Sequence, residues 1–329
     1  MSPPETNPGA ARNLRVAMIG AGGFAPRHLD VLAAESGVHV VGHVARTRAS
    51  ADAQAARYGG RAYDDVPGLL AAEHVDAAWI SVPPGVHGAI EHALITAGVP
   101  FLVEKPLSAD ADTAERIASA VAARGLVTAV GYHWRALDGV AVVRERLAAG
   151  PPVRLLTAAW HGSTPAPAWW RREAESGGQM VEQATHLIDL ALHLLGDAEV
   201  LHAAESRAPR DAYPDADVAE ASSATLRFAS GALGIVSATC VLGGSDRVEL
   251  RLHREGELLV ITQDALTIDT GTERRVVRHR DDPVAAEDRA FLAAVRAGDP
   301  TLVVCDYAEA LRTHRVAQRV RALGYASTT

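Results

Sequence analysis

Lysine and cysteine are the scarcest reactive side chains of this 329-residue sequence. The two cysteines, Cys240 and Cys305, are too few for a disulfide framework or a thiolate metal cluster. Lysine occurs once, at Lys105, and the other 31 basic residues are arginines. The lone lysine therefore needs a chemical explanation that surface charge does not supply.

Long apolar runs and an excess of positive charge are also missing. The longest weakly polar run, residues 231–244, is shorter than the ~20 residues of a transmembrane helix and contains Ser237 and Thr239. A net charge of −8 argues against a partner such as nucleic acid or a membrane surface. Residues 1–12 are polar and proline-rich and lack the apolar run of a secretory signal, so we expect a disordered tail and a cytoplasmic location.

Residues 13–132 alternate between predicted strands and predicted helices. This rhythm indicates an α/β domain built on a doubly wound, mostly parallel sheet. The predicted strands are 14–20, 38–45, 61–63, 75–82, 99–104 and 126–132, and the helices between them are 25–35, 49–58, 67–73, 86–97 and 111–124.

The pattern changes after residue 132, where strand candidates follow one another with short turns. Such a series is typical of an open, mainly antiparallel sheet. We therefore predict a second, α+β domain over residues 133–329, for substrate binding and oligomerisation. Its expected strands are 153–161, 199–206, 218–229, 232–241, 246–253 and 257–262, and its helices are 140–149, 180–195, 284–297 and 306–322.

The first predicted strand ends in a glycine-rich turn. The residues Gly20, Gly22, Gly23, Phe24 and Ala25 fit the pattern G-x-G-x-x-A at the start of a helix. Glycine is needed there because a side chain would block the turn and the approach of a pyrophosphate to the helix N-terminus. In this strand–helix context the motif predicts a dinucleotide-binding Rossmann domain.

The end of the second strand bears on the choice of cofactor. NAD enzymes usually carry an acid there, which binds the adenosine ribose diol. Here Ala45 takes that position and Arg46, Thr47 and Arg48 follow it. The missing acid and the following cations favour the 2′-phosphate of NADP, with NAD as the second possibility.

Two further motifs end strands at the same edge of the predicted sheet. Ser81 precedes Pro83, Pro84 and His87, and the strand 99–104 ends in Glu104-Lys105-Pro106. Ligands bind at the carboxyl edge of open α/β sheets. A proline pair can also be only a rigid turn, and a Glu-Lys pair only solvated surface, so neither motif decides the function alone.

Together these motifs resemble the Gfo/Idh/MocA oxidoreductases, which include glucose-fructose oxidoreductase and inositol dehydrogenases. The run ISVPPGVHGAIEHALITAGVPFLVEKPLS carries most of the likeness. The glycine-rich turn precedes it, and a helix with Glu182 and His186 follows, where the family has D-x-x-x-H. The pair Trp170-Arg171 also stands before Gly177-Gly178 as it often does in the family. The motifs match in order and spacing over nearly the whole chain.

The resemblance implies a role for each matching position. Lys105 and His186 would be the catalytic groups, beside the nicotinamide ribose and the reacting hydroxyl. Glu104 would help to hold the cofactor. Further cofactor contacts would come from Ser81, Pro83, Pro84, His87, His133, Trp170 and Arg171, and further substrate contacts from His133 and Glu182. The aromatic rings of Trp134 and Trp160 are added to the expected substrate contacts on a separate ground, given below.

Two positions depart from the family pattern. Glu182 stands where the family has aspartate, so its carboxylate reaches one methylene further. His133 replaces an amide residue at the end of the strand 126–132 and would alter substrate choice or act as an equivalent hydrogen-bonding group.

The predicted helix 180–195 leaves a metal site open as an alternative. Its residues Glu182, His186, Asp189 and His193 share one face by their i, i+3 and i+4 spacing. One helix rarely supplies a full ligand shell, so we predict no metal. Asp189 is instead expected to orient His186 or to tether the helix, and His193 to be a packed or surface residue.

Four of the five tryptophans, Trp134, Trp160, Trp169 and Trp170, fall within residues 134–170. They either pack the core of the second domain or form flat walls that suit a sugar or polyol ring. Trp79 lies within a predicted strand and is expected in the core.

The predicted function is an NADP-dependent dehydrogenase or reductase. It would move a hydride between nicotinamide and a secondary alcohol or ketone of a sugar, polyol or sugar-derived substrate, as a cytoplasmic homodimer or homotetramer. Lysine suits the proton transfer because its pKa, ordinarily about 10.4, can be lowered by its surroundings, whereas arginine stays protonated. Two alternatives remain: an NADP-binding regulator without activity, and an enzyme that keeps its cofactor and oxidises its substrate transiently for elimination or epimerisation.

Overall fold

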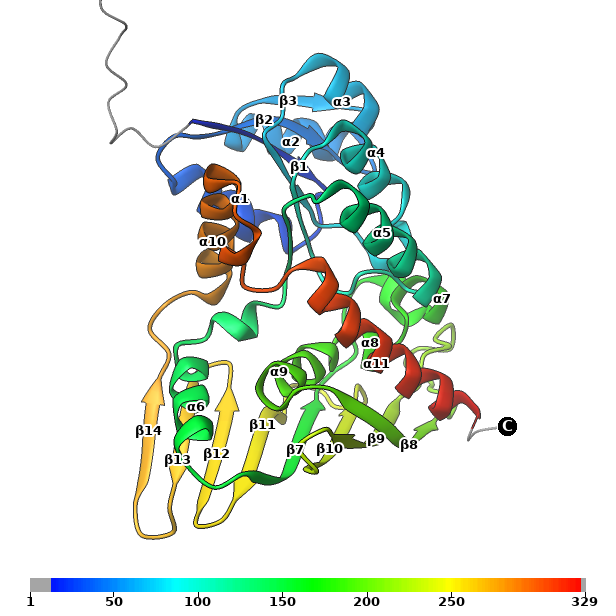
Figure 1. Cartoon of the computed structure of the whole chain (residues 1–329). Coiled ribbons are helices and arrows are strands. Elements are labelled where there is room, and N and C mark those ends of the chain that lie inside the picture. Colours follow the sequence, from blue (N-terminus) through cyan, green and yellow to red (C-terminus); the bar gives the residue numbers. More distant parts are fainter. Residues whose placement is uncertain (1–12, 327–329) are drawn as a thin grey trace, which may run out of the picture.

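The computed structural model describes residues 13–326, and the expected tail at 1–12 lies outside them. Its first sheet has six parallel strands in the order β3-β2-β1-β4-β5-β6 (Figure 1). This is the order of a doubly wound nucleotide-binding sheet, with its switch point between β1 and β4, so the predicted fold class is confirmed. The strands are β1 (Leu14–Ile19), β2 (Val38–Val44), β3 (Arg61–Tyr63), β4 (Ala77–Ile80), β5 (Phe101–Val103) and β6 (Thr128–Val130).

Helices cover both faces of this sheet, which explains why its central strands read as unbroken apolar runs. Every residue of β4, β5 and β6 is buried. Several helices begin where the sequence supplies a cap: the Asp65 and Asp110 side chains accept backbone N–H groups at the starts of α3 and α5. The helices are α1 (Ala25–Ala34), α2 (Arg48–Tyr58), α3 (Val66–Ala72), η1 (Pro84–Val86), α4 (Ala89–Ala97) and α5 (Ala111–Arg124).

The second sheet has eight strands in the order β14-β13-β12-β11-β7-β10-β9-β8. Only β7 and β10 pair in parallel, and every other neighbouring pair is antiparallel, as expected. The strands are β7 (Val153–His161), β8 (Ala198–Ser206), β9 (Ala221–Phe228), β10 (Leu233–Thr239), β11 (Arg247–Arg254), β12 (Glu257–Thr262), β13 (Ala265–Asp269) and β14 (Arg274–Arg278).

Two local predictions were wrong. The strands β13 and β14 were not predicted. β14 is an exposed, arginine-rich edge strand without a buried apolar alternation, whereas β13 is short but alternates, with Leu266 and Ile268 buried. The predicted helix 180–195 is interrupted at residues 183–184, so α8 (Gln179–Glu182) and α9 (Thr185–Leu195) are separate helices. Shorter elements precede them: η2 (His133–Ala136), η3 (Ala168–Arg171) and α7 (Glu173–Ser176).

One face of the second sheet is covered by the helices α6 (Asp138–Ala149), α9 and α11 (Tyr307–Ala326). Leu187 and Leu190 of α9 belong there to one hydrophobic core together with Leu156 and Val236 of the sheet. The other face carries exposed apolar side chains, among them Leu233, Ile235 and Val276.

The last part of the chain returns to the first sheet. The helix α10 (Pro283–Ala297) lies beside α1, and Phe291 packs edge-on against Trp79 of β4, which is buried in the core as predicted (Figure 1). Beyond η4 (Pro300–Leu302), Tyr307 and Leu311 fill the core on the opposite face of the same sheet. We keep the domain boundary at residues 132/133 as a proposal, with α10 and the start of α11 contributing to the core of the first domain.

Candidate active site

The glycine-rich turn joins β1 to α1 at the carboxyl edge of the first sheet. Gly20 has φ +112°, and a Cβ atom built on it would lie 1.9 Å from the carbonyl oxygen of Ser81. Only glycine fits there. Residues 21–23 are exposed at the N-terminus of α1, where backbone N–H groups attract an anion. The turn is therefore a cradle of the kind that a cofactor pyrophosphate needs.

The segment after β2 presents two different arginines. Arg48 is held by Asp52 at 3.1 Å and Asp64 at 3.2 Å, and Thr47 caps α2 by accepting the Ser50 N–H. Arg46 is exposed, and no carboxylate among residues 13–326 pairs with it. Of the two predicted arginines, Arg46 is the one whose charge remains available to a 2′-phosphate.

The Pro-Pro motif forms the short helix η1. Pro84 is buried, and its carbonyl oxygen accepts the N–H of Ala109. The His87 side chain is completely buried, and its Nδ1 lies 2.5 Å from Glu91 Oε1 at the start of α4. In this structure His87 therefore orders the turn, and its predicted contact with the cofactor remains a prediction.

Glu104 and Lys105 follow β5 and point to different partners. The Glu104 carboxylate accepts from His28 at 3.1 Å, and Gly131 is needed beside it because a Cβ there would lie 2.5 Å from Glu104 Oε1. Lys105 Nζ donates to the backbone oxygen of Glu182 at 2.7 Å and to its Oε1 at 2.8 Å. Glu182 thus uses two of the three ammonium hydrogens.

Glu182 also receives a hydrogen bond from the Trp-Arg motif. Trp170 is 1 % exposed and its indole Nε1–H donates to Glu182 Oε2 at 2.7 Å. Its neighbour Arg171 lies over the ring of Tyr213 and 3.4 Å from Asp215. The longer side chain at position 182 therefore spans Lys105 and Trp170 at once.

His186 is buried among aromatic rings. Trp160 of β7 stacks on it with ring centroids 5.7 Å apart, and His133 approaches edge-on at 4.8 Å. Burial, together with the charge of Lys105, lowers the pKa of His186 well below its ordinary value, so the ring is neutral at neutral pH. Its Nδ1 has no hydrogen-bond partner among the described residues. Burial also lowers the pKa of His133, to about 4.

For Trp134 and Asp189 the structure favours one of the two roles that the sequence left open. Trp134 is 1 % exposed and packs in the core behind His186, so in this structure it supports the histidine and offers no surface to a substrate. Asp189 does not orient His186. Both of its oxygens accept from Arg135 at 2.8 Å, and Thr313 Oγ1 donates to it, so Asp189 tethers α9 to η2 and α11.

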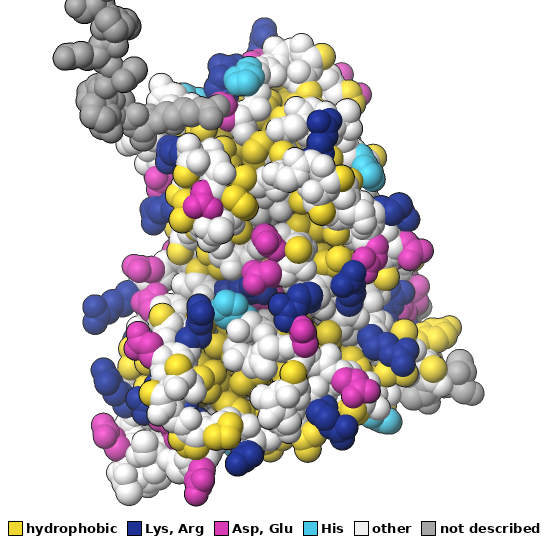
Figure 2. Space-filling view, in the orientation of Figure 1, with side chains coloured by type: hydrophobic (Ala, Val, Ile, Leu, Met, Phe, Trp, Pro, Cys, Tyr) yellow, Lys and Arg dark blue, Asp and Glu magenta, His cyan; other side chains and the backbone are white. Residues whose placement is uncertain are grey.

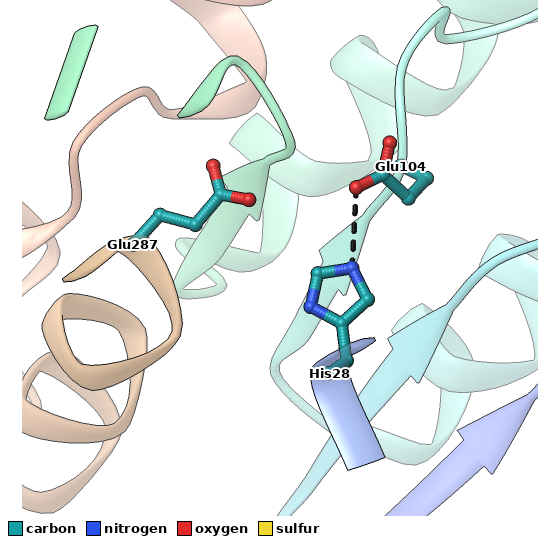
Figure 3. Close-up of side chains that lie close together, drawn as sticks. All are labelled: His28, Glu104 and Glu287. Atoms are coloured by element: carbon teal, nitrogen blue, oxygen red, sulfur yellow. Dashed lines mark hydrogen bonds and ion pairs between the residues drawn. The ribbon is translucent and has the colours of Figure 1, made fainter. Parts of the chain in front are cut away.

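Sequence reasoning missed a buried network below the Glu104 turn. His28 of α1 lies between Asp288 of α10, at 2.9 Å, and Glu104 (Figure 3). Burial alone would lower the pKa of His28, but Asp288 and Glu104 together raise it to about 10. Trp79 Nε1–H also donates to Asp288, at 2.7 Å. The only sequence signal was that His28 follows the glycine-rich motif on the first turns of its helix.

The surface carries no large single-charge field on the face shown in Figure 2, where acidic and basic side chains are interspersed. Within residues 13–326, no helix combines the length and apolar character that a membrane span requires.

Comparison with known proteins agrees with this arrangement. Residues 14–132 match the family model "Oxidoreductase family, NAD-binding Rossmann fold", and residues 141–257 match the GFO/IDH/MocA C-terminal domain. A 4-carboxy-2-hydroxymuconate-6-semialdehyde dehydrogenase of Sphingobium is 26 % identical over 87 % of this chain and 91 % of its own length. Levoglucosan dehydrogenase of Pseudarthrobacter phenanthrenivorans is 25 % identical over 69 % of this chain and 68 % of its own.

Among solved structures, UDP-N-acetylglucosamine 3-dehydrogenase from Acidithiobacillus ferrooxidans superposes with a TM-score of 0.82. It is 25 % identical and covers 96 % of this chain and 99 % of its own. The likeness of fold therefore extends over both sheets.

Proposed function

The chain belongs to the Gfo/Idh/MocA family of oxidoreductases, and from this premise we propose that it is an NADP(H)-preferring dehydrogenase or reductase of a sugar, polyol or sugar-derived substrate. The observation that carries the proposal is the contact between the only lysine of the chain and Glu182, next to a buried neutral histidine. A proton-transfer group and a polar binding group converge there at the carboxyl edge of a nucleotide-binding sheet.

The cofactor proposal rests on the fit of the residues present. The cradle at Gly20 and the exposed amides of residues 21–23 suit a pyrophosphate. Ala45 offers no carboxylate to a ribose diol, while Arg46 offers an unpaired cation to a 2′-phosphate. When bound, the nicotinamide would supply the hydride acceptor or donor.

The protein would supply binding and proton transfer. Lys105 would move the proton of the reacting hydroxyl, with Glu182 holding the ammonium group in place. His186 would hydrogen bond the substrate through its neutral ring, in a position fixed by Trp160 and His133. Ser81, Pro83, Pro84, His87 and Arg171 remain proposed members of the cofactor site.

The substrate class rests on chemistry and on relatives. Trp160 is half-buried and presents a flat apolar ring beside His186, which suits the carbon face of a sugar or polyol. Two of the relatives described above are named as dehydrogenases of sugars, levoglucosan and UDP-N-acetylglucosamine. The semialdehyde dehydrogenase of Sphingobium makes a carboxylated carbonyl compound the second class to test.

We also propose that the chain assembles as a homodimer or homotetramer through the open face of the second sheet. Leu233 and Ile235 of β10 are 43 % and 45 % exposed there, on alternate positions of one strand. An apolar row of this kind is more often covered by a partner than left in water.

The decisive experiment is a screen of sugars, polyols, their ketones and carboxylated aldehydes, with all four nicotinamide cofactors, followed by the absorbance of the reduced ring. Turnover with a sugar or polyol and a preference for NADP(H) would support the proposal. Cofactor binding without any turnover would favour the alternative of an NADP-binding regulator without activity. Retention of the cofactor through gel filtration, with no net redox change, would favour transient oxidation for elimination or epimerisation.

A further inference from the structure

Glu287 of α10 is the least satisfied buried acid of the described chain. Glu287 is 2 % exposed, and neither of its carboxyl oxygens has a hydrogen-bond partner among the described residues. Leaving a buried polar group without a partner is costly, so native proteins rarely do so without a ligand or water to satisfy it. Glu287 is unlike Asp288, its neighbour, whose oxygens are taken by His28 and Trp79.

The position of Glu287 places it under the proposed cofactor site. Its carboxyl group points toward Glu104 and His28, with a ligand atom of each within 4.8 Å of the others (Figure 3). Glu104 is the residue directly before Lys105, and His28 contacts Phe24 of the glycine-rich turn edge-on at 5.4 Å. Glu287 therefore lies close to the Glu104-Lys105 motif, proposed for the nicotinamide end of the cofactor, and one residue removed from the glycine-rich turn, proposed for its pyrophosphate.

A metal ion is a poor match for this cluster. His28 has no free nitrogen, because Nδ1 lies 2.9 Å from Asp288 and Nε2 lies 3.1 Å from Glu104. A metal would have to displace the proton that the two carboxylates hold on that ring. The partner that would suit Glu287 is a neutral group that can both donate and accept a hydrogen bond.

We propose that Glu287 binds the carboxamide of the nicotinamide ring, an inference that rests on the proposed cofactor. Burial, followed by the charge of Glu104, raises the pKa of Glu287 well above its ordinary value, so the group is a neutral acid. A carboxylic acid donates through its O–H and accepts at its C=O, and a primary amide offers the matching acceptor and donor. The cofactor would thus supply a partner to carboxyl oxygens that have none among the described residues.

The test is equilibrium titration of the protein with NADPH and with its reduced 3-acetylpyridine analogue, in which a methyl group replaces the amide NH2. Wild-type protein should prefer NADPH by about 3- to 10-fold, the range of one hydrogen bond. Glu287→Met should bring the ratio of the two dissociation constants close to one. Glu287→Gln keeps a donor and an acceptor and should restore most of the preference.

Thermal unfolding without cofactor separates this role from a structural one. Glu287→Met removes an unpartnered buried group, so the ligand-free variant should melt at the same temperature as wild type or higher. Asp288→Asn is the matched control on the same helix: it breaks the pairing with His28 and should lower the melting temperature while leaving the ligand ratio unchanged.

An unchanged ligand ratio in Glu287→Met, or a clear loss of its ligand-free melting temperature, would overturn the inference alone. A stoichiometric metal ion found in wild-type protein but not in Glu287→Met would also overturn it. Failure of wild-type protein to bind either nicotinamide compound would overturn the proposed function together with it.

Discussion

Glu182 connects Lys105 to Trp170 through its two carboxylate oxygens. Oε1 accepts from the Lys105 ammonium at 2.8 Å and Oε2 accepts from the Trp170 indole at 2.7 Å. All three side chains are largely buried. Hydrogen bonds of this kind, with a charged partner and little water, are stronger than those between neutral groups. The contact fixes the position of the only amine side chain in the sequence.

Loss of the Glu182 charge should therefore weaken turnover more than cofactor binding. We expect Glu182→Gln to lower kcat by about 10- to 100-fold, the range of one charge-assisted hydrogen bond. Titration with NADPH should give a dissociation constant near that of wild type. Glu115→Gln, which removes an exposed ion pair with Arg315, is the control and should change neither value. Full turnover in Glu182→Gln would show that Lys105 needs no such support.

The cofactor preference should depend on Arg46 and not on Arg48. Arg46→Ala should weaken NADPH binding by about 10-fold or more while leaving NADH unchanged, because only the 2′-phosphate requires that cation. Arg48→Ala is the matched control, since Asp52 and Asp64 already neutralise its charge. The double variant Ala45→Asp, Arg46→Ala should prefer NADH. Tighter binding of NADH by wild-type protein would contradict this assignment.

The sequence predicted the first domain well because its signals are local. Buried strands alternate with helices there, and Gly20 sits in a turn whose geometry excludes every other residue. The strand order then follows from the general rules for doubly wound sheets. In the second domain, β14 lacked a local signal, because its residues are mostly exposed arginines and its pairing with β13 is set by the sheet.

The sequence motifs predicted which residues form the candidate site, but not which side chains contact one another. Sequence order indicated that Lys105, Glu182 and His186 belong together, yet the partner of Asp189 is Arg135, from a different part of the chain. The link between His28 and Asp288 spans 260 positions, so no spacing rule could find it. Contacts of that range depend on how α10 packs against α1, which only the folded structure defines.

The His28 network should make stability depend on pH on the alkaline side. Its carboxylate partners raise the pKa of His28 from the ordinary 6.5 to about 10 in the folded state. The stabilisation is therefore fully present below pH ~6.5 and is lost as the pH rises toward 10, with a slope of about 1.4 kcal/mol per pH unit. Urea unfolding of wild type and His28→Gln over this range should show a difference that shrinks with pH. A constant difference would mean that His28 is neutral when folded.

His186 should act without becoming charged. Burial keeps its pKa well below the ordinary value, so we expect no change in turnover near pH 6.5 that depends on this ring. His186→Ala should lower kcat by about 10²-fold or more and leave NADPH affinity nearly unchanged. Activity should survive EDTA, because the predicted role needs no metal. A loss on chelation that zinc or another divalent ion restores would overturn the assignment.

Lys105 should be the group that moves the proton. A purely electrostatic role would be kept by arginine, whose charge is the same, but arginine holds its proton at neutral pH. Lys105→Arg should therefore lower kcat by about 10²- to 10⁴-fold, the usual range for a positioned acid or base, with little change in NADPH affinity. Because Lys105 is the only lysine, an amine-directed reagent can modify only this side chain and the α-amino group. Mass spectrometry should then find Lys105 protected by bound cofactor. Retention of most activity in Lys105→Arg would reduce Lys105 to a binding residue and assign the proton transfer to His186.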